Sequence, residues 1–152
     1  MPDATPEVVL AFDFGLRRIG VAIGDTLTAS ARPLQAVHVD GSLNEADWQR
    51  LLELPRRHAA RRIVVGCPYN VDGSVQALTM QAREFAHSLG TRSALPVHLV
   101  DERYSSLEAE QALRERRAAG TRRARIDRAA IDSAAAAVIL ERWFAGEGER
   151  GA

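Results

Sequence analysis

The chain has 152 residues, 46% of them hydrophobic, and 20 acidic side chains balance 20 basic ones. A chain of this length fits one domain that buries roughly 68–70% of its unfolded surface, and its zero net charge is by itself no reason to invoke nucleic acid. Because Cys67 is the only cysteine, an intramolecular disulfide is excluded. A membrane span is excluded as well, since the longest apolar run, 134–140, is far shorter than the roughly 20 residues that cross a bilayer.

The first forty residues are expected to form three strands. Segment 8–14 is apolar, a turn follows at 15–18, and a returning strand over 19–23 completes a hairpin. A third strand is expected over 33–39. A polar stretch then leads to a helix expected over 44–60.

From residue 62 onwards, strands alternate with helices. A strand is expected over 62–66, whose apolar run Ile63-Val64-Val65 is typical of a central strand covered on both faces. A loop rich in turn formers ends at Ser74, the expected N-cap of a helix that Gly90 should stop. The remaining expected elements are a strand over 96–101 and helices over 105–117 and 127–144.

This order of elements predicts an α/β protein with a mixed five-stranded sheet and helices on both faces. Crossover connections between parallel strands are right-handed, so the later strands should run parallel to the first. We expect residues 1–152 to form a single domain, with flexible ends at about 1–6 and 146–152. The N-terminal segment has neither a basic region nor a leading apolar stretch, so we expect a cytoplasmic protein.

Three acidic residues stand at the ends of apolar segments far apart in the chain. Asp13 closes the first strand, Glu102 follows the strand over 96–101, and Asp132 opens the apolar part of the last helix. Together in the fold, any two would repel by on the order of 4 kcal/mol at about 4 Å, which a divalent cation would relieve. Oxygen ligands without a Cys or His pair favour Mg²⁺ or Mn²⁺. Such a site suits phosphodiester hydrolysis by two metal ions.

Each acid also has a simpler interpretation. An acid at the end of a strand often only forms a turn or pairs with an arginine such as Arg17 or Arg103. Asp132, near the start of a helix, could instead interact with the positive end of the helix dipole. His98 lies on the Glu102 side of its strand and could support the site, although a histidine satisfied within the sheet is the favoured interpretation.

An arginine-rich run separates the last two expected helices and precedes Asp132. All basic side chains are arginine, which binds phosphate in a bidentate manner, although the base composition of the genome would explain this equally well. The run suits a phosphate backbone, and a solvated helix end is the alternative. The candidate substrate-binding residues are Arg122, Arg123, Arg125 and Arg128, with Arg17 in the turn after Asp13.

Four blocks of the sequence resemble the YqgF/RuvX family, in the family's order and over nearly the whole chain. The blocks cover residues 13–22, 66–74, 101–106 and 132–136. In the same order, their first three residues are Asp13-Phe14-Gly15, Gly66-Cys67-Pro68, Asp101-Glu102-Arg103 and Asp132-Ser133-Ala134. The resemblance implies an RNase H-like fold and a role as a Holliday-junction resolvase or as the nuclease that matures the 5′ end of pre-16S ribosomal RNA.

The resemblance also implies roles for individual residues. Asp13, Glu102 and Asp132 would be the metal-binding catalytic acids. Residues implied to lie near the substrate are Asn70, Arg103, Ser105 and Ser106. The chain departs from the family at Ala130, where a lysine is usual two positions before the last acid, and Arg128 is the nearest basic residue.

Two other function classes stay open. An Asp-x-Gly hairpin turn also resembles the phosphate loop of actin-like phosphotransferases, although these need a second lobe for which the chain is too short. A module that binds nucleic acid and assists ribosome maturation without cutting is also compatible with the sequence. Symmetric cutting of a four-way junction would require two active sites and hence a homodimer, whereas trimming RNA would not.

Overall fold

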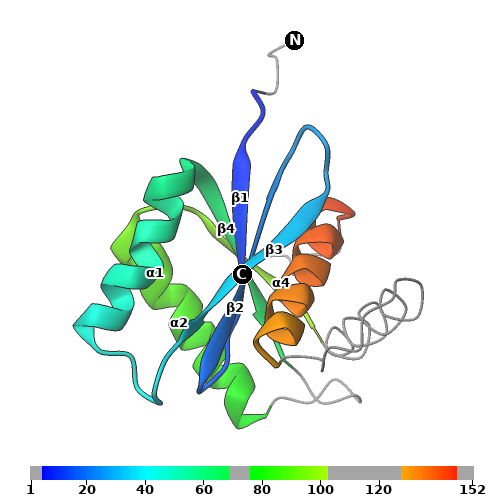
Figure 1. Cartoon of the computed structure of the whole chain (residues 1–152). Coiled ribbons are helices and arrows are strands. Elements are labelled where there is room, and N and C mark those ends of the chain that lie inside the picture. The colour runs from blue at the N-terminus through cyan, green and yellow to red at the C-terminus, as the bar shows by residue number, and fades with distance from the viewer. Residues whose placement is uncertain (1–4, 69–75, 103–127, 147–152) are drawn as a thin grey trace.

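Five strands form one mixed sheet in the order β3-β2-β1-β4-β5 (Figure 1). The structure, a computed structural model, describes residues 5–68, 76–102 and 128–146. The strands are β1 (Val8–Asp13), β2 (Arg18–Asp25), β3 (Ala31–His38), β4 (Ala60–Cys67) and β5 (Val97–Asp101). β2 is antiparallel to β1 and β3, whereas β4 and β5 run parallel to β1. The predicted mixed five-stranded sheet is confirmed.

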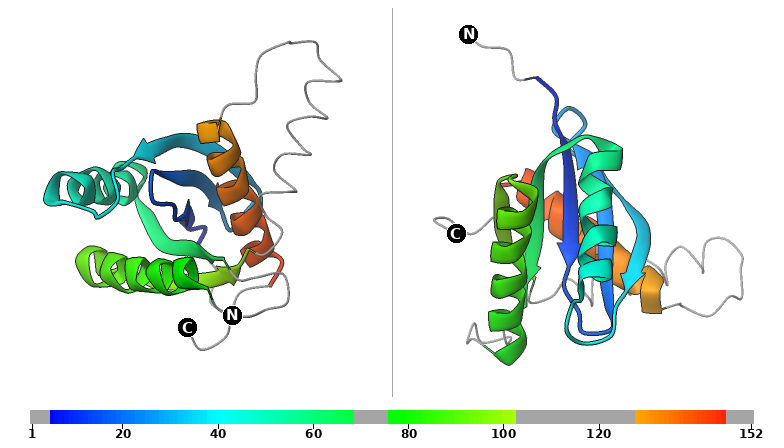
Figure 2. Two further views of the ribbon diagram at one scale, coloured as in Figure 1. Left: turned by 90° about the horizontal axis from the view of Figure 1, so that it is seen from below. Right: turned by 90° about the vertical axis from the view of Figure 1, so that its left-hand side faces the viewer.

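Helices cover both faces of the sheet, as predicted (Figure 2). α1 (Glu45–His58) and α2 (Ala77–Ser93) pack on one face, and α4 (Arg128–Phe144) packs on the other. Alternate β1 residues divide between the two cores, so that Phe12 packs with α1 and α2 while Ala11 packs with α4. Some predicted features lie outside the described residues. They are the helix expected over 105–117 and the chain ends 1–4 and 147–152. Within the described ranges, no helix combines the length and apolarity needed to cross a membrane.

Local capping rules predict the start of α1 but not the ends of α2. Asn44 caps α1, since its side chain accepts a hydrogen bond from the Asp47 backbone N–H at 2.8 Å. α2 has Gln76 as its N-cap instead of the expected Ser74, which lies outside the described residues. The expected stop at Gly90 is wrong, because α2 continues to Ser93. A Cβ on Gly90 would lie 3.3 Å from Val97 Cγ2, so this glycine allows α2 to pack closely on β5.

Candidate active site

Asp13 and Glu102 meet at the end of the sheet where β1, β4 and β5 finish. Asp13 is the last residue of β1, and Glu102 follows β5 and donates its backbone N–H to Cys67 O of β4 at 3.1 Å. Both side chains extend on the face that α4 covers, because Ala11 and Val100, two positions earlier in each strand, belong to the α4 core. A hydrogen bond joins the two carboxyl groups, and protonated Glu102 donates it to Asp13.

The two carboxyl groups are difficult to ionise together. Burial, reinforced by the charge of Asp132, raises the pKa of Asp13 from 3.8 to about 6. Burial and the charge of Asp13 raise the pKa of Glu102 well above its usual value, whereas the Arg142 guanidinium opposes this rise. Glu102 is only 9% exposed. The fold therefore places two carboxyl groups where both cannot be ionised at once unless a cation lies between them, and a proton on Glu102 relieves the repulsion otherwise.

Asp132 lies in the second turn of α4 and bonds to an arginine that we did not predict from the sequence. Arg18 Nε donates to Asp132 Oδ2 at 2.8 Å, and both side chains are partly buried. Asp132 is also close enough to raise the pKa of Asp13 through its charge. One signal could have identified Arg18. It stands two residues before Gly20, the β2 neighbour of Asp13, and therefore points to the same face of the sheet.

Two glycines on either side of Asp13 allow α4 to approach the sheet. Asp13 pairs with Gly20 of β2 and with Gly66 of β4. A Cβ on Gly20 would lie 2.0 Å from the backbone carbonyl oxygen of Asp132, and one on Gly66 would lie 3.1 Å from Glu102 Oε2. The missing side chains provide the space in which Glu102 and the start of α4 lie. Next to Gly20, the Val21 backbone N–H donates to Ser133 Oγ at 3.2 Å and fixes α4 on β2.

The structure places His98 within the sheet and away from the carboxyl pair. Its Nε2 lies 3.3 Å from Arg62 Nη1, and its ring lies 5.2 Å from the ring of Trp143. Burial and the nearby charge of Arg62 lower the pKa of His98, so the imidazole is neutral near pH 7. The favoured interpretation, a histidine satisfied within the sheet, agrees with these contacts.

The candidate substrate-binding residues fall into two groups. Arg17 lies exposed in the turn before β2, and Arg128 lies exposed at the first position of α4. Their role stays a prediction. The other candidates lie outside the described residues, and they are Asn70, Arg103, Ser105, Ser106, Arg122, Arg123 and Arg125.

The carboxyl pair fits a divalent cation, because two adjoining carboxylates in a largely desolvated place need positive charge between them once both are ionised. Asp132 is turned towards Arg18 instead. Among residues 5–68, 76–102 and 128–146, no three acidic, histidine or cysteine side chains are arranged to hold one ion. The prediction that all three acids share a metal therefore remains a prediction.

Comparison with known proteins identifies relatives along nearly the whole chain. The family model RuvX, described as Holliday junction resolvase, matches residues 7–146. A protein of Edwardsiella ictaluri (strain 93-146) named "Putative pre-16S rRNA nuclease" is 46% identical over 139 residues, which are 91% of this chain and 95% of the relative. A protein of the same name from Xylella fastidiosa (strain M23) is 46% identical over 149 residues, 95% of this chain and 94% of the relative.

The fold is also similar to that of a solved RuvC structure. Thermus thermophilus RuvC in complex with a Holliday junction substrate superposes with a TM-score of 0.56 at 20% identity, covering 92% of this chain and 94% of RuvC. This likeness confirms the RNase H-like fold that the sequence blocks implied. The match of the family model over residues 7–146 and the relatives at 46% identity show that the chain belongs to the RuvX family.

Proposed function

We propose that the protein is a divalent-metal-dependent endonuclease that hydrolyses phosphodiester bonds in structured nucleic acid. The observation that carries this proposal is the carboxyl pair of half-buried Asp13 and buried Glu102, to which the start of α4 brings Asp132. Membership of a family described as Holliday junction resolvase, with relatives named for pre-16S rRNA, supports it. The metal is Mg²⁺ or Mn²⁺, since the candidate ligands are all carboxylate oxygens.

The residues of the chain have distinct roles in this proposal. Asp13 and Glu102 would hold the metal, and Asp132 would complete the catalytic acids beside them. Bound divalent ions lower the pKa of the attacking water and stabilise the leaving oxygen. Arg18 positions Asp132 close to the carboxyl pair through a 2.8 Å ion pair. Arg142 donates to the Asp101 carbonyl oxygen at 3.1 Å and keeps positive charge beside Glu102.

We infer that the physiological substrate is the 5′ end of pre-16S ribosomal RNA. In this proposal the cut takes place in the cytoplasm, and residues 1–152 act as a single domain. The family description makes a four-way DNA junction the second candidate. That substrate would require a homodimer with two active sites. Arg17 and Arg128, together with the candidate residues outside the described ranges, would contact phosphate in either case.

The deciding experiment offers both substrates to the purified protein with Mg²⁺, with Mn²⁺ and with a chelator, and measures the solution mass in the same buffer. We expect metal-dependent cleavage at the mature 5′ end of the RNA by a monomer. Symmetric cutting of the junction by a dimer would favour resolution. Binding of either substrate without cleavage under any metal condition would contradict the nuclease and favour a factor that only binds.

Metal affinity is expected to fall at least about tenfold between pH 7 and pH 5. The pKa of Asp13 is raised to about 6 and that of Glu102 is raised as well, so protons compete with the metal in this range. Calorimetric titration of the metal-free protein with Mn²⁺ at both pH values measures the difference. Buffers of different ionisation enthalpy should show that binding releases protons. Equal affinity at both pH values, without proton release, would place the metal elsewhere.

A further inference from the structure

Arg18 lies at the end of the sheet where the carboxyl pair is found, and on the same face. It is the first residue of β2 and stands two residues before Gly20, which pairs with Asp13. Two residues of an antiparallel strand span about 7 Å, so Arg18 lies beyond the last residue of β1 along the strand direction. α4 closes this face farther along β2, because a Cβ on Gly24 would lie 3.0 Å from Phe144 Cε2. A nucleic acid therefore reaches the pair from the end of the sheet at which Arg18 stands.

The ion pair with Asp132 uses one of the five N–H groups of the Arg18 guanidinium. Nε donates to Asp132 Oδ2 at 2.8 Å, whereas Nη1 and Nη2 have no hydrogen-bond partner among the residues that the structure describes. The Arg18 side chain is 25% exposed, so solvent reaches it. The outer end of the guanidinium, with four N–H groups, is thus available to an anion.

The backbone of Arg18 is fixed on both sides. Arg18 pairs with His38 of β3, and the Val39 N–H donates to the neighbouring Arg17 carbonyl oxygen at 2.9 Å. On the other side, a Cβ on Gly15 would lie 2.5 Å from the Arg18 carbonyl oxygen, so the turn before β2 packs closely on this residue. A guanidinium that is held by its Nε and mounted on a fixed strand is already oriented before a ligand binds, which lowers the entropy cost of binding.

We propose that Arg18 binds the backbone phosphate that lies at the Asp13–Glu102 pair, with Nη1 and Nη2 donating to its non-bridging oxygens. The inference rests on the proposed function and deepens it, because it assigns a substrate contact to a residue that otherwise only positions Asp132. A planar guanidinium stays charged and matches a phosphate in a bidentate manner. A positioned arginine also stabilises the negative charge that develops on the phosphate oxygens during hydrolysis.

Two variants that remove the same ion pair from opposite sides separate a phosphate contact from a purely structural bond. Fluorescence anisotropy measures how the full chain binds a labelled fragment of the precursor RNA, with chelator present so that no cleavage occurs. We expect Arg18→Gln to bind about 10-fold more weakly, with a log-log salt slope reduced by about 0.7. Asp132→Asn should bind at least as tightly as the wild type, because it removes a negative charge and leaves the guanidinium in place. Equal losses in both variants, or unchanged binding by Arg18→Gln, would overturn the proposal.

A neutral phosphate analogue locates the contact along the RNA. A methylphosphonate replaces one charged oxygen by a methyl group, and it is placed at one position at a time, on a 2′-deoxy sugar that the reference RNA also carries. At the contacted position, the loss caused by Arg18→Gln should shrink from about 10-fold to less than about twofold, because both changes remove the same contact. The carboxyl pair acts equally in both proteins and cancels from the comparison. In the presence of Mn²⁺, the contacted phosphate should be the one that is cut. A constant loss at every position, or a contact away from the cut phosphate, would contradict the proposal.

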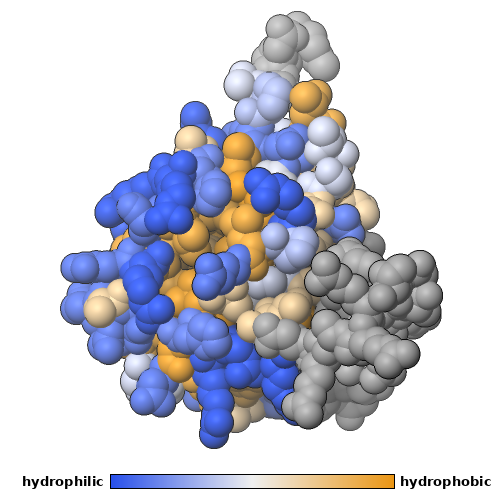
Figure 3. Space-filling view, in the orientation of Figure 1, coloured by the Kyte–Doolittle hydropathy of each residue, from blue (hydrophilic) through white to orange (hydrophobic). Residues whose placement is uncertain are grey.

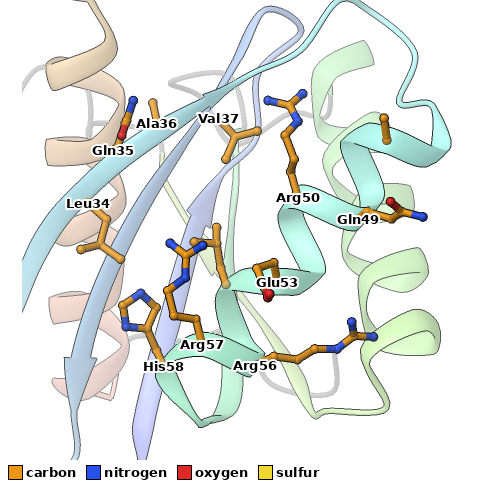
Figure 4. A pocket seen from close by; sticks show the side chains of 12 residues that line it. Leu34, Gln35, Ala36, Val37, Gln49, Arg50, Glu53, Arg56, Arg57 and His58 are labelled. Carbon is orange, nitrogen blue, oxygen red and sulfur yellow. The ribbon is translucent and has the colours of Figure 1, made fainter.

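The matched control is Arg57→Gln, which removes an exposed arginine on the other face of the sheet. Arg57 lines a groove of about 1080 Å³ between β3 and α1, together with apolar side chains such as Leu34 (Figure 4). In Figure 3, apolar surface occupies the middle of the molecule's front face and is flanked by hydrophilic residues. Arg57 lies three residues before Ala60, which pairs with Val8 at the beginning of β1, and is therefore far from Asp13. The control should show the same loss as the wild type at each methylphosphonate position.

The result for Arg18 is separate from the result for the proposed function, because binding is measured without metal. A protein that shows the Arg18 contact at one phosphate and never cuts would defeat the nuclease and support the contact. A protein that cuts and shows no such contact would do the reverse. Thermal melting checks that Arg18→Gln is folded. Arg18→Lys keeps the charge without the planar fork, so it should recover only part of the affinity, and it carries the same comparison if Arg18→Gln does not fold.

Discussion

Replacing Asp13 by asparagine is expected to lower metal-dependent cleavage by at least about 100-fold and to raise the thermal stability of the metal-free protein at pH 7. The loss of activity follows from the removal of one of two buried carboxylates that face each other. The gain in stability follows from the same burial. An asparagine side chain fills a similar volume without a charge and can donate a hydrogen bond to Glu102.

The sign of the stability effect follows from proton binding. Burial raises the pKa of Asp13 from 3.8 to about 6, so between these values the folded chain binds more protons than the unfolded chain. Stability from this group is therefore lost as the pH rises towards 6, and at pH 7 the ionised carboxylate destabilises the fold by about 2–3 kcal/mol. We expect Asp13→Asn to melt about 4–8 °C higher at pH 7, and the difference to shrink near pH 5.

The matched control for this experiment is Asp40→Asn, which changes an exposed aspartate before α1. It should alter neither activity nor melting temperature. Circular dichroism during heating, in the presence of a chelator, measures stability, and cleavage of the precursor RNA with Mn²⁺ measures activity. An Asp13→Asn variant that folds and cleaves normally would remove Asp13 from the mechanism. A variant that is inactive but less stable would contradict the inferred charge repulsion.

The second large effect is expected for Gly20→Ala. The new Cβ would lie 2.0 Å from the Asp132 carbonyl oxygen, 2.3 Å from its carbonyl carbon and 2.9 Å from the Ser133 nitrogen. All three are backbone atoms of α4, so no side chain can rotate to make room, and the helix itself must move. We expect a loss of about 3 kcal/mol or more in the free energy of unfolding, measured by urea denaturation.

The displacement of α4 should also separate Asp132 from the carboxyl pair, so the folded fraction of Gly20→Ala should cleave poorly. Gly90→Ala is the control, because its nearest neighbour is the Val97 Cγ2 methyl at 3.3 Å and alanine is favoured in a helix. Its stability should stay within about 1 kcal/mol of the wild type. A Gly20→Ala variant as stable and active as the wild type would show that α4 does not need its close contact with β2.

Local patterns predicted most of the fold correctly for a physical reason. A strand exposes alternate residues to opposite faces, so the apolar run Ile63-Val64-Val65 already indicated a strand covered on both sides, which is β4. The polar stretch before α1 likewise indicated where that helix begins, and Asn44 caps it. Gly90 misled because one glycine can either end a helix or permit close packing, and the Val97 neighbour that decides between them comes from a different element.

The sequence by itself determined the strand and helix order and the positions of Asp13 and Glu102 at strand ends, because these depend on short-range periodicity. Only the tertiary structure decided which groups meet. The Arg18–Asp132 bond joins residues 114 positions apart, and the register that places Gly20 and Gly66 beside Asp13 depends on strand pairing. The bulge in β3, where Val37 pairs with Ile19 and Leu34 with Val21, likewise depends on the pairing of two strands. Such contacts depend on packing between distant segments, which no local pattern in the chain encodes.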